Sequence, residues 1–163
     1  MAERSALRIL VVDDDPAMVR LAAAALTAHG FTDLEHVATG RDALLAAARA
    51  DVLLLDQNLP DLAGREVLLA LRAWPEPPSV VMVTAHGSET FAADALRAGA
   101  EDYLVKDASL AAMLPEVVER VRRMRSLREA LATAERELLH VERRAAVGEM
   151  TVTKEIVDRV HKE

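Results

Sequence analysis

Six polar side chains directly follow short apolar runs in the first two thirds of the sequence. They are Asp13, Asp14 and Asp15 after Ile9–Val12, Asp56 after Val52–Leu55, Thr84 after Val80–Val83, and Lys106 after Tyr103–Val105. Clustered carboxylates repel one another unless a hard divalent cation lies between them, and Mg²⁺ prefers oxygen ligands. One carboxylate can attack phosphorus as a nucleophile, while an ammonium and a hydroxyl neutralise and orient phosphoryl oxygens. These residue types therefore suit phosphoryl transfer that depends on Mg²⁺ or Mn²⁺.

The apolar runs alternate with segments of helical composition. Strands are predicted at 9–12, 34–37, 52–55, 80–83 and 103–105, and helices at 18–28, 42–49, 65–73, 88–98 and after a cap at Ser109. Asp15 followed by Pro16 indicates an N-cap and a first helical residue. Continuous apolar strands separated by helices predict an α/β fold with a parallel sheet covered on both faces. Because the carboxyl ends of parallel strands meet at one edge, the polar side chains should gather there.

Beyond Ser109 helix-forming residues continue almost unbroken to the C-terminus. One apolar position of a seven-residue repeat holds Val117, Met124, Leu131, Leu138 and Ala145, and the other holds Leu127, Ala134 and Val141 after an interruption at Arg120. This spacing is typical of a coiled coil, which would make the chain a homodimer. The alternative is a single amphipathic helix that packs on its own domain.

The composition limits the remaining possibilities. Apolar residues make up 52% of the 163 residues, enough for one domain with a core, and cysteine is absent, which excludes disulfides and thiol chemistry. Residues 1–107 hold 9 Lys/Arg and 17 Asp/Glu, whereas residues 108–163 hold 11 and 10. Neither part favours nucleic-acid binding. No apolar run is long enough to cross a bilayer and the N-terminus does not resemble a signal peptide, so a cytoplasmic protein without a membrane partner is expected.

Four stretches together resemble the receiver domain of two-component response regulators, the CheY-like family. They are ILVVDDDP (9–16), LLLDQNLPDLAG (53–64), VVMVTAHGSE (80–89) and AGAEDYLVKD (98–107). The likeness extends over residues 6–122. It implies a doubly wound five-stranded parallel sheet of order 2-1-3-4-5. We accordingly expect a receiver domain at 1–122 and a helical extension for dimerisation or signalling at 123–163.

The resemblance also assigns roles by position. Asp56 resembles the phosphoacceptor, and Asp13 and Asp14 resemble the acidic pair of the metal site, with Asn58 as a backbone-carbonyl metal ligand. Thr84 and Lys106 resemble the hydroxyl and the lysine that contact the phosphoryl group, and Ala85 resembles the residue whose N–H binds it. Tyr103 resembles an aromatic switch residue coupled to Thr84. Asp15 is expected to act only as a helix cap, and Asp61 to lie on the loop surface. Asp107 replaces the proline usual in the family after the lysine, and a trans peptide is expected there.

The tail offers a second, weaker likeness. Residues 142–151, ERRAAVGEMT, resemble the segment before the phospho-accepting histidine of histidine kinases. A His-Glu pair should follow about eight residues after Gly148, but Ile156 stands there, and His161 is followed by Lys162. Either the chain is a fragment of a receiver-containing kinase, or the likeness is chance. The sequence contains no kinase catalytic domain in either case.

Three functions follow from these observations. The first is a phosphorelay module in which Asp56 accepts a phosphoryl group from the phosphohistidine of a kinase or phosphotransfer protein. Thr84 and Tyr103 would then bias the face made by the fourth helix, fifth strand and fifth helix, and with it the C-terminal helix. The second is a dimerising coiled-coil scaffold with an inactive receiver. The third is a phosphatase of the haloacid-dehalogenase type built on Asp13 and Asp15.

Overall fold

The computed structural model describes residues 2–160, with side chains up to residue 147 and at 159. Its strands are β1 (Arg8–Val12), β2 (Asp33–Val37), β3 (Val52–Leu55), β4 (Ser79–Thr84) and β5 (Asp102–Val105). Its helices are α1 (Ala2–Ala6), α2 (Pro16–Thr27), α3 (Gly40–Ala46), the 3₁₀ turn η1 (Ala47–Arg49), α4 (Gly64–Arg72), α5 (Glu89–Arg97) and α6 (Leu110–Val160). All strand pairs are parallel, in the order β2-β1-β3-β4-β5, which confirms the predicted topology.

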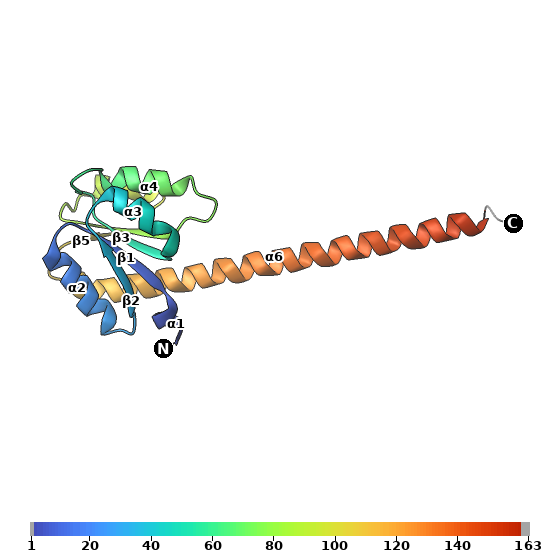
Figure 1. Cartoon of the computed structure of the whole chain (residues 1–163), viewed down its shortest axis with the longest axis horizontal. Coiled ribbons are helices and arrows are strands. Elements are labelled where there is room, and N and C mark those ends of the chain that lie inside the picture. The colour runs from blue at the N-terminus through green and yellow to red at the C-terminus, as the bar shows by residue number, and fades with distance from the viewer. Residues whose placement is uncertain (1, 161–163) are drawn as a thin grey trace. The chain divides into compact units, whose positions relative to one another are not determined.

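Alternating side chains of the central strands form two cores, one on each face of the sheet. Ile9 and Val11 of β1 face α2 and the first turns of α6, whereas Leu10 and Val12 face α3 and α4. Figure 1 shows the sheet between these two helical layers. The central strands β1, β3 and β4 are buried on both faces from Ile9 onward, which explains why they are almost continuously apolar in sequence, whereas the edge strand β2 is largely exposed.

The predicted helices are present, and their first and last residues differ slightly from the expected ones. Asp15 caps α2 as predicted, with its carboxylate accepting the Ala17 N–H at 2.9 Å. Helix α1 was not predicted. Ser109 directly precedes α6, but its hydroxyl donates to the Asp107 carboxylate at 2.5 Å instead of capping the helix. The Lys106–Asp107 peptide is trans, as expected.

Helix α6 contributes to two compact units, Met1–Arg123 and Met124–Glu163. In the first unit, Val117 lies in the core beside Leu114 and Val118. Its assignment to the heptad stripe is therefore wrong, because it packs against the sheet. In the second unit the remaining large stripe residues are exposed: Met124, Leu127, Leu131, Leu138 and Val141.

Two sequence predictions concern the end of the chain. Residues 142–147 of the kinase-like segment are helical with exposed side chains, and His161 lies outside the described residues. Across residues 2–160, no helix is both long and apolar enough to cross a membrane.

Candidate functional site

Four strand ends bring the predicted polar residues to one edge of the sheet. Asp13 follows β1, Asp56 follows β3, Thr84 ends β4 and Lys106 follows β5. Asp13, Asp56 and Thr84 are nearly inaccessible to solvent, at 2%, 5% and 1% exposure. Burial of two carboxylates is costly unless they are paired or bind a cation, so we expect cationic groups at this edge of the sheet.

Lys106 bridges the two buried carboxylates. Its Nζ lies 2.7 Å from Oδ2 of Asp13 and 3.3 Å from Oδ2 of Asp56. Burial alone would lower the pKa of Lys106, but its hydrogen bond to Asp13 and the charge of Asp56 outweigh burial and raise that pKa. The ammonium therefore stays protonated over the whole physiological range.

For Asp56, in contrast to Lys106, the effect of burial on the pKa is not outweighed by the neighbouring groups. Burial and the nearby negative charge of Asp13 raise the pKa of Asp56, and the Lys106 ammonium and the Asn58 backbone N–H only partly offset them. A carboxylate that resists ionisation retains high basicity when it is ionised. Such a group is a stronger nucleophile than an exposed aspartate.

Asp13, Asp14 and Asp56 form a possible metal site. Each can place a carboxylate oxygen within 4.8 Å of the others, and Asp14 is exposed. Oδ1 of Asp13, the oxygen that Lys106 does not contact, accepts the Asp15 N–H at 2.9 Å, which holds the orientation of the carboxylate. Three carboxylates of which one faces solvent fit Mg²⁺ well, because Mg²⁺ takes few protein carboxylates and keeps several waters.

The loop after Asp56 folds tightly back on it. Asn58 pairs with Ala63 in an antiparallel bridge, and the Gly64 N–H donates to the Gln57 carbonyl at 2.8 Å. A Cβ added at Gly64 would lie 2.3 Å from the Asp56 carbonyl oxygen, so only glycine fits. The predicted metal ligand Asn58 is exposed in this loop.

The two predicted switch residues meet at His86. The His86 N–H donates to the Thr84 hydroxyl at 3.4 Å, and the Tyr103 hydroxyl donates to the His86 carbonyl. Ala85, the predicted N–H donor to the phosphoryl group, lies between Thr84 and His86 and is exposed. Because His86 contacts both side chains, a shift of the Thr84 hydroxyl would alter the backbone at His86, which binds the Tyr103 hydroxyl.

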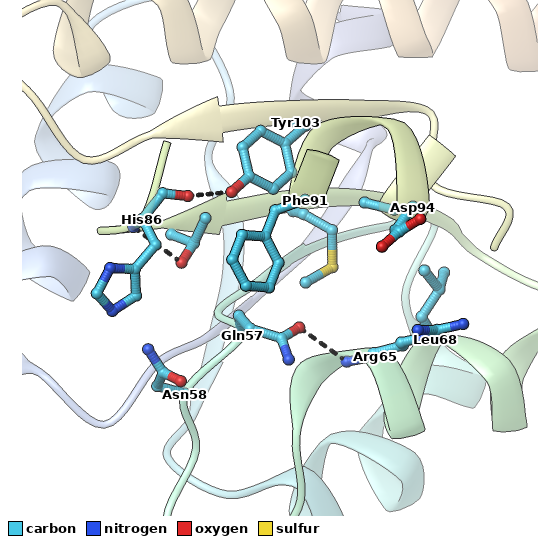
Figure 2. A pocket seen from close by; sticks show the side chains of 11 residues that line it. Gln57, Asn58, Arg65, Leu68, His86, Phe91, Asp94 and Tyr103 are labelled. Atoms are coloured by element: carbon cyan, nitrogen blue, oxygen red, sulfur yellow. Dashed lines mark hydrogen bonds between the residues drawn. The ribbon is translucent and has the colours of Figure 1, made fainter. Parts of the chain in front are cut away.

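A cavity of about 250 Å³ opens beside these residues. Its lining includes the apolar side chains of Leu68, Met82 and Ala95, and Figure 2 shows Phe91 projecting between Tyr103 and the polar side chains of Gln57 and Asn58. The cavity gives the Tyr103 ring free space next to Thr84.

Three other acidic residues are used structurally. Asp15 caps α2, so its carboxylate serves a helix start, which weakens the phosphatase alternative. Asp107 accepts the Ser109 N–H at 2.9 Å. Asp61 is exposed in its loop, as expected, and its carboxylate also accepts N–H groups from the start of α3. Sequence reasoning missed this bond because Gly40 lies 21 residues earlier.

Comparison with known proteins agrees with this geometry. Residues 9–119 match the family model described as response regulator receiver domain. The transcriptional regulatory protein KdpE of Mycobacterium tuberculosis is 38% identical over 117 residues, covering 71% of this chain and 51% of that protein. The chain thus spans about half the length of this curated relative.

Solved structures give the same picture. The signal receiver domain of a putative Luxo repressor protein from Vibrio parahaemolyticus matches with a TM-score of 0.71 and 31% identity, covering 77% of this chain and 96% of that one. The BeF3-activated DrrB receiver domain matches with a TM-score of 0.64 and 26% identity, covering 71% and 96%.

Proposed function

The chain belongs to the family of response regulator receiver domains, and on this premise we propose that it is a phosphoacceptor module of a two-component phosphorelay. Asp56 is the acceptor. The observation that carries the proposal is the buried pair Asp13 and Asp56 bridged by Lys106, with Asp14 beside them. The donor is the phosphohistidine of a histidine kinase or phosphotransfer protein.

In the proposed reaction an Asp56 carboxylate oxygen attacks phosphorus. The bond between phosphorus and the donor nitrogen breaks, and an acyl phosphate forms. Asp13, Asp14, Asp56 and the Asn58 carbonyl would hold Mg²⁺ or Mn²⁺, which screens charge on the phosphoryl oxygens when bound. Two further donors, Lys106 and the Ala85 N–H, would stabilise the charge that develops in the transition state.

The direct test is incorporation of acid-labile phosphate from a small phosphodonor with Mg²⁺. We expect labelling of the full chain, loss of labelling in Asp56→Asn, and loss on chelation. Equal labelling of the wild type and Asp56→Asn would refute the assignment. Turnover of a phosphate ester that is lost in Asp13→Asn but kept in Asp56→Asn would instead support the phosphatase alternative.

We further propose that phosphorylation is read through Thr84 and Tyr103. Their shared link to His86 supports a movement in which Thr84 turns toward the phosphoryl group and Tyr103 follows into the neighbouring cavity. This movement changes the surface made by α5, β5 and the start of α6. A Tyr103→Ala variant should still be labelled at Asp56 but should lose the phosphorylation-dependent response of its partner.

The output element in this proposal is the second part of α6. Its exposed apolar stripe, Met124, Leu127, Leu131, Leu138 and Val141, supports pairing with the same helix of a second copy. The scaffold alternative shares this dimer. It differs in predicting an oligomeric state and partner binding that do not respond to phosphodonor, which sedimentation with and without phosphodonor distinguishes.

A further inference from the structure

The loop between β3 and α4 is tied to a distant helix by one side chain, Asp61. The Asp61 carboxylate accepts the backbone N–H groups of Gly40 at 2.8 Å and Arg41 at 3.0 Å, the first residues of α3. It also accepts the Leu62 N–H at 2.9 Å within its own loop. The hydrogen bonds from these N–H groups, above all the one from Gly40, hold the pKa of Asp61 below its usual range, so the carboxylate is ionised at neutral pH.

The packing around this tie leaves little room for the loop to move. A Cβ added at Gly40 would lie 2.9 Å from the Cβ of Leu62, so the loop backbone approaches the helix start closely. Where the two ends of the loop meet, Gly64 has the same tight relation to the Asp56 carbonyl. Asn58 lies between Asp56 and Asp61 in the chain and carries the carbonyl that the proposed metal site uses.

Capping of α3 does not require Asp61. Thr39 is the N-cap of this helix, and its hydroxyl accepts the Asp42 N–H at 3.1 Å. Asp61 takes the two N–H groups that precede Asp42. Because it comes from a segment some twenty residues further along the chain, its bonds fix the loop as much as they fix the helix.

We propose that Asp61 is a positioning residue for the phosphorylation of Asp56, which holds the loop 57–63 against α3 so that Asn58 stays in place to bind the metal. The inference rests on the proposed function. It assigns Asp61 no contact with the metal or the phosphoryl group. Supporting groups of this kind typically change metal affinity or activity by roughly 10- to 100-fold when they are removed.

The test compares Asp61→Ala with Thr39→Ala in the full chain. Both remove acceptors from the same helix start, but only the first releases the loop. We expect Asp61→Ala to weaken Mg²⁺ binding, measured by titration calorimetry with the metal alone, by roughly tenfold. Labelling by a small phosphodonor should slow to a similar degree. Thr39→Ala should lower the denaturant midpoint without Mg²⁺ but leave the Mg²⁺ affinity within twofold of wild type.

Equal Mg²⁺ affinities of Asp61→Ala and Thr39→Ala would overturn the inference, because Asp61 would then act only as a second cap. If Asp61→Ala does not fold, Asp61→Asn decides the case, since it keeps one acceptor oxygen. A rise in its Mg²⁺ dissociation constant supports the inference, and an unchanged constant overturns it. Absence of Mg²⁺ binding and labelling in the wild type would refute the proposed function itself, which separates the two failures.

Discussion

Asp56 shares its buried position with a second carboxylate, Asp13, and with one cation, Lys106. Two buried negative charges and one positive charge leave the edge of the sheet with an excess of negative charge, before Asp14 is counted. An uncompensated buried charge is costly. The site is therefore expected to gain stability from a divalent cation, and Lys106 competes with that cation for the same oxygens.

Replacement of Lys106 by methionine should separate metal binding from phosphoryl transfer. Without the ammonium, Asp13 and Asp56 lose the cation that bridges them, so Mg²⁺ should bind several-fold more tightly. Phosphorylation should slow by roughly 100-fold, the usual effect of removing one transition-state donor. Calorimetry and labelling rates measure the two effects. Arg65→Met, which removes a cation from the lining of the nearby cavity, is the control and should change neither the Mg²⁺ affinity nor the labelling rate as strongly.

The raised pKa of Asp56 predicts a gain in stability when its charge is removed. A carboxyl whose pKa is higher in the folded protein stabilises the fold when protonated, at low pH, and this contribution is lost as pH rises through the folded pKa. Asp56→Asn should therefore raise the free energy of unfolding at pH 7. The gain should shrink as pH falls toward the ordinary aspartate range. Urea unfolding without Mg²⁺ at pH 4 to 8 tests this, and a lower stability of Asp56→Asn at pH 7 would contradict it.

At the scale of elements, the strands of the sheet could be predicted because each is coded locally. A run such as Val52–Leu55 is apolar throughout, and the polar residue after it marks the carboxyl end. The acidic and basic site residues followed from those ends. The Asp61 tie and helix α1 could not be predicted, because both are held by residues far along the chain. In α1, Arg4 donates to Glu119 across 115 residues.

The contact between Arg4 and Glu119 joins α1 to α6 inside the first unit. Glu119 accepts from Arg4 at 3.1 Å and from Arg122 at 2.8 Å, and Arg122 also pairs with Glu3 at 3.0 Å. The hydrogen bond from Arg122 and that from Arg4 lower the pKa of Glu119 to about 2 despite partial burial. A short helix of five residues has little stability of its own, so these bonds are what keep α1 on the domain.

Glu119 should therefore make the fold sensitive to acid. Its folded pKa lies below its usual value, so its contribution is present above about pH 4.5 and is lost as pH falls toward 2. Glu119→Gln should lower the free energy of unfolding at pH 7 by roughly 1.5–3 kcal/mol, the usual value of hydrogen bonds to charged groups. It should also flatten the loss of stability between pH 5 and 2. Urea unfolding across this range measures both effects.

The matched control is Glu116→Gln, an exposed glutamate one turn earlier on the same helix. It removes the same charge without touching Arg4 or Arg122, so its unfolding curve should follow that of the wild type. Equal acid sensitivity of both variants would show that overall charge, rather than the tie between α1 and α6, governs unfolding at low pH.

At the scale of the whole molecule, the charge of the chain changes after residue 107, and its two compact units divide after Arg123. The acidic part, residues 1–107, contains the carboxylate cluster, whereas the rest of the chain holds nearly balanced charge. The second unit, Met124–Glu163, exposes large apolar side chains at heptad spacing. An isolated helix does not usually expose such a stripe, which is why we propose that a second copy covers it.

Leu131 and Leu139 test this pairing within one helix. Both are largely exposed, at 61% and 54%, but only Leu131 belongs to the heptad stripe. Leu131→Asp places a charge in the proposed seam and should convert the full chain from dimer to monomer in sedimentation equilibrium. Leu139→Asp adds the same charge outside the stripe and should leave the dimer intact. Phosphate incorporation at Asp56 should be unaffected in both, because the acceptor site lies wholly in the first unit. Equal dissociation by both substitutions, or a monomeric wild type, would rule out the seam, and the stripe would then need a partner other than a second copy.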